Sequence, residues 1–172
     1  MHTEAWLAYC GYLVWLSAGL CDFLCHRRTD LPHTSGVAES VTHLLQLALL
    51  GAAIVVGLAF ETGRATTLLL TVLVAAHALV GYIDTRIAFR RRRVILPVEQ
   101  HIHSVLDMAP IIALAWLVIR SWPTAVQGDW HIGFRTPAVP LSIWLAVLLP
   151  AVLLCVLPAI VEFRAARAAS AR

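Results

Sequence analysis

The chain has 172 residues, of which 60% are hydrophobic and only 13% are charged, and its mean hydropathy is +0.80. Soluble domains contain about 45–50% apolar and about 25% charged residues, so a water-soluble fold of this length could not bury so much apolar surface. The net charge of +3 comes from 13 arginines that gather at the ends of apolar runs. That pattern argues against a nucleic-acid-binding surface and indicates membrane topology.

Five apolar segments are each long enough to cross the hydrocarbon core of a bilayer, which takes roughly 20 residues of helix. In chain order they cover residues 6–25, 37–60, 65–89, 98–119 and 139–163. Only a short turn separates the second segment from the third, so these two helices are expected to be antiparallel neighbours. The sequence therefore predicts an all-α fold, a single integral membrane helical bundle over residues 1–172.

The arginines predict how the bundle is oriented. If the loop after the first helix faces the cytoplasm, ten arginines lie on that side and three on the other. The ten are Arg27, Arg28, Arg86, Arg90, Arg91, Arg92, Arg93, Arg164, Arg167 and Arg172. By the positive-inside rule, we expect the N-terminus outside and the C-terminus in the cytoplasm, in a membrane such as the bacterial inner membrane.

Ionisable side chains inside membrane helices are costly and by default indicate function. Each of the first four predicted helices carries one carboxylate and one histidine on a shared face; the pairs are Asp22/His26, Glu39/His43, His77/Asp84 and Glu99/His103. Residues four or seven apart lie on the same side of a helix. Because successive helices run in opposite directions, all four pairs are expected near one depth, on the arginine-rich side. The sequence thus predicts a metal-binding core of four helices, since carboxylate and imidazole together suit iron, manganese or zinc.

Two further residues are expected to support these ligands. Asp107 lies one turn beyond His103 and could orient an imidazole by a hydrogen bond. His101 is two residues from His103, on a different face of the helix, and therefore ranks below it as a ligand.

Other readings of the same residues stay open. Asp22 and Asp84 lie near helix C-termini, where the helix dipole disfavours negative charge, and could instead pair with nearby arginines. Cys21 and Cys25 share a face one turn apart, and thiolate ligation is an alternative to simple packing.

A four-helix bundle with inward carboxylates and histidines resembles the di-iron carboxylate proteins, whose pattern includes Glu-x-x-His. The pairs here have three intervening residues instead of two. The cluster is also broadly similar to the His-rich membrane desaturases and hydroxylases, which bind two irons at the cytoplasmic face, although the HxxxH and HxxHH boxes of those enzymes are absent. These resemblances imply two iron ions, a hydrophobic lipid-like or isoprenoid substrate that enters from the bilayer, and a separate electron donor.

Two alternatives from other classes remain. One is a zinc-dependent membrane hydrolase, in which three ligands hold zinc and a carboxylate acts as base. The other is not an enzyme: a b-type haem protein with two axial histidines, or an accessory subunit of a larger membrane complex.

Overall fold

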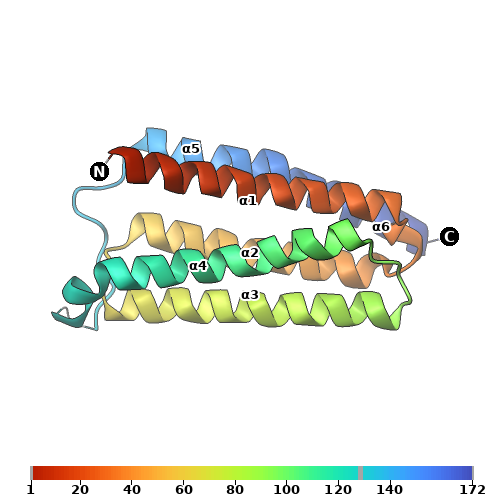
Figure 1. The fold of residues 1–172 in the computed structure, drawn as a ribbon, viewed down its shortest axis with the longest axis horizontal. Helices are drawn as coiled ribbons and strands as arrows, with labels where there is room; N and C mark the ends of the chain where they lie inside the picture. The colour runs from red at the N-terminus through yellow and green to blue at the C-terminus, as the bar shows by residue number, and fades with distance from the viewer. Residues whose placement is uncertain (1, 128–129, 172) are drawn as a thin grey trace.

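Five long helices form a bundle in the computed structural model, which describes residues 2–127 and 130–171 (Figure 1). The first four are α1 (His2–Arg28), α2 (Gly36–Ala59), α3 (Arg64–Arg90) and α4 (Pro97–Gln127). The fifth is continuous and consists of α5 (Leu141–Ala151), a π-helical turn η2 (Val152–Val156) and α6 (Leu157–Ser170). A short 3-10 helix, η1 (Leu31–His33), joins α1 to α2. All five helices are long and apolar enough to cross a membrane, which confirms the predicted fold class.

Several helices extend beyond the apolar segments that predicted them. Helix α1 continues to Arg28 rather than residue 25, α4 to Gln127 rather than residue 119, and α6 to Ser170 rather than residue 163. Hydropathy marks only the part of a helix that lies among lipid tails, whereas arginine-bearing turns continue the helix into the polar interface. Of the arginines predicted to face the cytoplasm, Arg172 lies outside the described residues.

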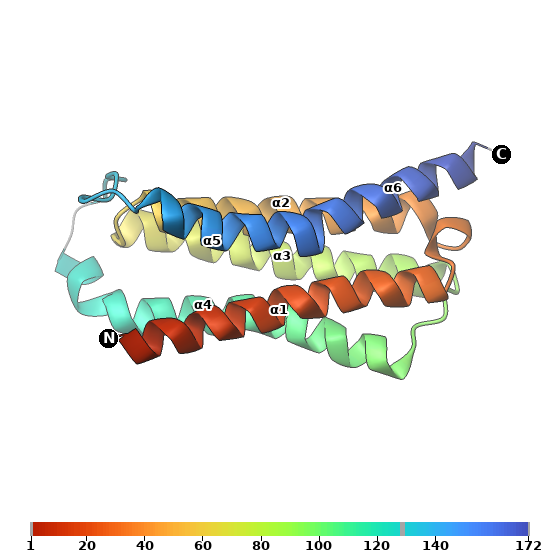
Figure 2. The ribbon, with the colours of Figure 1, turned by 90° about the horizontal axis from the view of Figure 1, so that it is seen from above.

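The connections of the bundle divide between its two ends. Both the α1–α2 and α3–α4 connections lie at the end where α6 also finishes, here called the C-terminal end (Figures 1 and 2). The N-terminus lies at the opposite end, together with the α2–α3 and α4–α5 connections. Consequently the last turns of α1, α3 and α6 and the first turns of α2 and α4 share the C-terminal end.

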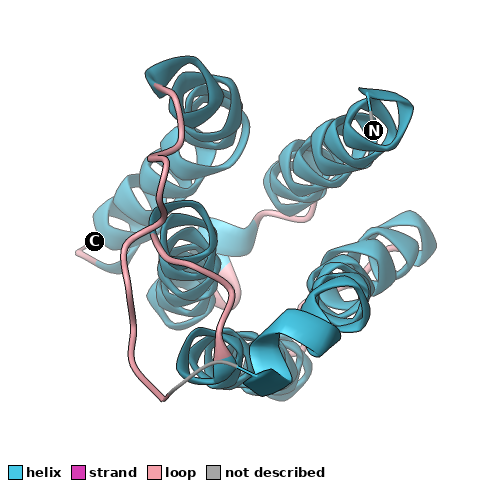
Figure 3. Cartoon of the chain, turned by 90° about the vertical axis from the view of Figure 1, so that its left-hand side faces the viewer, coloured by secondary structure: helices cyan, strands magenta, loops and turns pink. Residues whose placement is uncertain are grey.

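The distribution of side chains is the reverse of that in a soluble protein. Large apolar residues face outwards, among them Phe89 (81% exposed) and Ile119 (74%), whereas Glu39 and Glu99 are fully buried (0%). An outer surface of this kind is compatible with lipid tails, and polar groups must then be satisfied inside the bundle. Seen from one end, the helices are arranged around a common centre (Figure 3).

The fifth helix approaches α1 closely at its π-helical turn. A Cβ atom on Gly19 would lie only 2.9 Å from Cys155 Sγ, so a glycine is needed at this position. The Cys155 thiol in turn lies 3.6 Å from the carbonyl oxygen of Leu16. A π-helical turn holds an extra residue and so changes which face of the following helix points inwards. Along α6 that face carries a carboxylate, Glu162.

Candidate metal centre

Carboxylates and imidazoles from five helices meet near the C-terminal end of the bundle. Among the described residues they form three groups, and within each group the ligand atoms lie within 4.8 Å of one another. The groups are Asp22/His26/Glu99/His103, His26/His43/Glu162 and Glu39/His43/Asp84. They bring together seven of the eight residues predicted as ligands, all except His77, and add Glu162, which the sequence analysis missed.

The first group is organised around Asp22 on α1. One carboxylate oxygen, Oδ1, lies 3.0 Å from His103 Nε2, and the other, Oδ2, lies 3.3 Å from His26 Nε2. Glu99 Oε1 lies 3.6 Å from the same His26 nitrogen and 4.0 Å from His103 Nε2. Two imidazoles and two carboxylates therefore face one another across a space of atomic size, with Asp22 between the two rings.

The group Glu39/His43/Asp84 joins α2 to α3. His43 Nε2 lies 3.3 Å from Asp84 Oδ1, and the Thr42 hydroxyl hydrogen-bonds to the same carboxylate. Glu39, one turn before His43, completes the group. The i, i+4 spacing of Glu39 and His43 places them on one face of α2, as the sequence predicted.

Glu162, on α6, connects the group around Asp22 to the group Glu39/His43/Asp84. Its Oε2 accepts a hydrogen bond from His26 Nδ1 at 2.8 Å, and its Oε1 accepts one from His43 Nδ1 at 2.7 Å. The two imidazole rings stack in parallel, with centroids 4.6 Å apart and an interplanar angle of 7°. A single carboxylate thus fixes the orientation of both rings.

This arrangement leaves one nitrogen of each ring free. An ionised carboxylate only accepts hydrogen bonds, so each Nδ1 must carry its hydrogen and each neutral ring keeps its lone pair on Nε2. Both Nε2 atoms are buried and make no hydrogen bond within the part of the chain that the structure describes. Metal-binding histidines usually donate their other ring N–H to a carboxylate or carbonyl in this way. The imidazoles of His26 and His43 are therefore oriented as metal ligands are.

Arg93 closes the cluster from the loop between α3 and α4. Its guanidinium group donates to Glu39 Oε2 at 3.0 Å, to Glu99 Oε1 at 2.6 Å and to Thr29 Oγ1 at 3.1 Å. Burial disfavours the charge, but the hydrogen bond to Glu99 and the charges of both glutamates outweigh it and raise the pKa of Arg93 above its ordinary value. The sequence had left open an arginine pairing with the two aspartates. Among the described residues, Asp22 and Asp84 lie beside histidine nitrogens instead, at 3.0–3.3 Å.

Removing the Arg93 charge should destabilise the fold. Arg93→Met leaves two fully buried glutamates without their cation, and breaking a buried pair in this way costs about 3–5 kcal/mol. We expect a clearly lower thermal unfolding midpoint for the metal-free protein in mild detergent. Arg91→Met, which changes an exposed arginine two residues away, is the matched control. Equal midpoints for the two variants would contradict a structural role of Arg93.

The remaining predicted residues lie outside the three groups. His77 is buried (3% exposed) on α3, and neither of its ring nitrogens has a hydrogen-bond partner in residues 2–127 and 130–171. Asp107 lines a small polar cavity of about 40 Å³ with members of the groups, including Asp84 and His103. In the described part of the chain it makes no hydrogen bond to an imidazole. His101 is exposed on the outer face of α4, in agreement with its lower rank.

Comparison with protein-family models, curated proteins and solved structures found no match to this chain. The fold and the site therefore define the class on their own. The chain is a membrane-type helical bundle with buried histidine and carboxylate groups that could bind metal.

Proposed function

We propose that the chain is a membrane-embedded di-iron oxidoreductase that acts on an apolar substrate. The observation that carries the proposal is the pair of parallel imidazoles on Glu162, each presenting a free Nε2 to a different group of carboxylates. Asp22, Glu99 and His103 would join His26 at one ion. Glu39 and Asp84 would join His43 at the other.

The charge of the cluster supports two divalent ions. Five carboxylates are buried there, namely Asp22, Glu39, Asp84, Glu99 and Glu162. Arg93 offsets one of the five negative charges, and two divalent cations would offset the other four while the imidazoles stay neutral. Protonation of both His26 and His43 would neutralise this charge less favourably, because two parallel imidazolium rings 4.6 Å apart would repel each other.

The donor set favours iron over softer metals. Every candidate ligand is a carboxylate oxygen or an imidazole nitrogen, and no cysteine belongs to the three groups in the described residues. Carboxylates and histidines from the helices of a bundle are the ligands of di-iron carboxylate proteins. Bound iron would supply electron transfer to dioxygen, which side chains alone cannot perform.

The chain's own residues would orient and isolate the site. Glu162 holds two rings, Arg93 holds two glutamates, and the burial of all of them keeps bulk water away. The electrons would come from a separate partner protein, since the sequence shows no flavin, nicotinamide or iron–sulfur motif. The arginines at the same end of the bundle support a cytoplasmic position for the site.

Dioxygen consumption tests this function. The metal-free protein, loaded with ferrous iron under argon in mild detergent, should take up dioxygen faster than the same amount of iron in protein-free detergent. The zinc-loaded protein is the control, because zinc has no redox chemistry. Equal uptake with and without the protein would contradict the proposal.

A zinc-dependent lipid hydrolase is the second candidate. It is favoured by the group around Asp22, in which two histidines and one carboxylate could hold one zinc, with the fourth position left for water and the other carboxylate as the base. Hydrolysis of a lipid ester or amide by the zinc-loaded protein, without dioxygen uptake by the iron-loaded form, would favour this candidate.

A further inference from the structure

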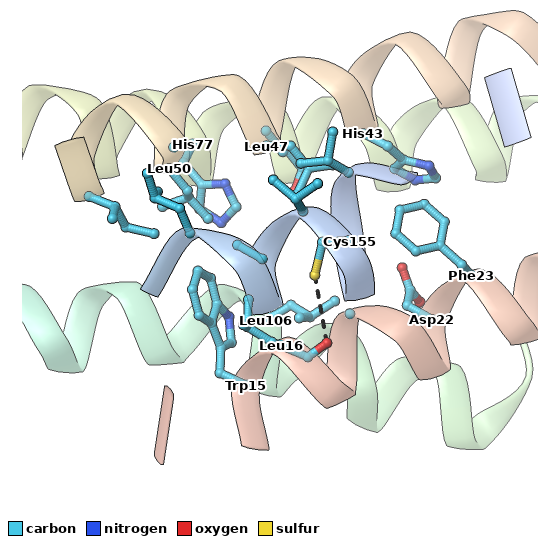
Figure 4. Close-up of a pocket in the computed structure, with 18 residues that line it drawn as sticks. Trp15, Leu16, Asp22, Phe23, His43, Leu47, Leu50, His77, Leu106 and Cys155 are labelled. Atoms are coloured by element: carbon cyan, nitrogen blue, oxygen red, sulfur yellow. Dashed lines mark hydrogen bonds between the residues drawn. The ribbon is translucent and has the colours of Figure 1, made fainter. Parts of the chain in front are cut away.

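A largely apolar cavity of about 180 Å³ leads from the metal groups toward the middle of the bundle (Figure 4). Its walls come from α1, α2 and the fifth helix, with His77 from α3 and Leu106 from α4. Asp22 and His43, which belong to the metal groups, lie at one end (Figure 4). The cavity is therefore continuous with the candidate centre.

The opposite end carries two polar groups without partners. His77 and Trp15 lie there, away from His43 and Asp22 (Figure 4). Among the described residues, neither ring nitrogen of His77 makes a hydrogen bond, and the buried Trp15 Nε1 has no acceptor. Buried polar groups are nearly always hydrogen-bonded, because an unpaired one destabilises the fold. Two such groups from different helices therefore offer hydrogen-bonding positions at one end of the cavity.

We propose that this cavity binds an uncharged molecule with an apolar body and one hydroxyl or carbonyl oxygen. The oxygen would accept a hydrogen bond from Trp15 Nε1–H and pair with a ring nitrogen of His77. The apolar body would extend toward His43 and Asp22. This inference rests on the proposed function, because it names the substrate class of the same site.

The lining residues support an uncharged ligand of this size. Among the described residues around the cavity, the only carboxylate is Asp22, at the far end from His77, and none is an arginine. A carboxylate or phosphate headgroup beside His77 would thus lack a permanent counter-charge. A dry apolar cavity of about 150 Å³ holds benzene, so this one could enclose a ring or a comparable length of chain.

Photolabelling can locate the ligand. The probe is a six-carbon alcohol that carries a diazirine at the end of its chain opposite the hydroxyl, and the comparison probe has the same chain and diazirine without the hydroxyl. Both are applied to the metal-free and the iron-loaded protein in mild detergent, and mass spectrometry identifies the labelled peptides. We expect the alcohol to label cavity-lining peptides of α1 and α2 more strongly than the comparison probe does.

Two glycines of α2 provide a matched pair of variants. Gly51 lines the cavity, and a Cβ atom there would meet nothing within 4 Å, so Gly51→Leu should fold and place its side chain in the cavity. Gly57 has equally free space but does not line the cavity. Labelling of the cavity peptides should disappear in Gly51→Leu and persist in Gly57→Leu. Equal labelling in these two variants would overturn the proposal.

A further pair of variants tests the hydrogen bond between the ligand and His77. His77→Phe removes its partner, and His101→Phe, which changes an exposed histidine, is the control. Labelling by the alcohol should fall about tenfold in His77→Phe only, because a buried hydrogen bond is lost, while the iron content stays unchanged. Equal labelling by the two probes, or unchanged labelling in His77→Phe, would mean that His77 and Trp15 hydrogen-bond to water instead of the ligand. Either result would overturn the assignment.

Specific labelling in a protein that binds no iron would contradict the di-iron function alone. Bound iron without cavity labelling would contradict this inference alone.

Discussion

His43→Ala is expected to lose nearly all bound metal. His43 belongs to two of the three groups, and its ring is held by Glu162 with Nε2 toward Asp84. Changes to groups that only orient a ligand cost about 10–100-fold in metal affinity, so loss of a ligand itself should cost at least as much. Iron content after dialysis, measured together with thermal unfolding in the same detergent, checks this expectation.

His103→Ala should show the same loss, since its Nε2 faces Asp22 in the first group. The matched control is His101→Ala, because His101 lies on the same helix but is exposed. An ion-pair network without metal predicts a different outcome, in which changes to the aspartates lower stability and changes to the histidines are nearly silent. Full iron retention in both His43→Ala and His103→Ala would rule out these ligands.

Glu162→Gln is the second substitution with a large expected effect. A glutamine side chain offers one acceptor oxygen and one donor amide, so it cannot accept a hydrogen bond from both His26 Nδ1 and His43 Nδ1. One imidazole would turn or exchange its tautomer and withdraw its Nε2 lone pair. We expect iron affinity to fall by about 10–100-fold.

A purely structural role for Glu162 predicts lower stability instead. Iron affinity and the unfolding midpoint of the metal-free form are therefore measured on the same preparation, with Glu61→Gln at the opposite end as the control. Glu61 is exposed and belongs to none of the three groups. Unchanged affinity with a lowered midpoint would contradict the positioning role.

The five helices, and the clustering of histidines and carboxylates at one end of the bundle, were predictable from the sequence. Bilayer thickness fixes how long an apolar segment must be, and alternating helix direction brings the end of α1 level with the start of α2. The four-residue spacing of pairs such as Asp22/His26 and Glu99/His103 then fixes their shared faces. Segment length, helix direction and residue spacing can all be taken from the sequence itself, so these predictions did not depend on how the helices pack. The metal itself stays a prediction.

Glu162 was missed because it is a single carboxylate with no histidine on its own helix. Its depth could have been predicted, since the fifth segment runs toward the same end as α1. The direction in which its side chain points could not be predicted, because the π-helical turn at Val152–Val156 changes which side of α6 faces inwards. Pro150 and Pro158 flank that turn, and proline inside a helix predicts a break in its hydrogen bonding, but it does not fix which residue then points inwards.

Arg93 was indistinguishable from its three neighbours in the arginine run. The structure separates them by backbone geometry: Arg92 has a left-handed conformation (φ 54°), and Arg93 N–H donates to the carbonyl of Ala88 at 3.0 Å. Such a turn ends a helix and redirects the chain. It leaves Arg93 buried while Arg91 and Arg92 stay exposed.

The iron content of the purified chain tests the central claim most directly. The metal-free protein is loaded with ferrous iron under argon, freed of loosely bound metal and measured by elemental analysis against protein concentration. The two linked groups predict about two irons per chain, the number that di-iron carboxylate bundles hold, and a large loss in His43→Ala. Iron no higher in the wild-type protein than in His43→Ala would contradict the account.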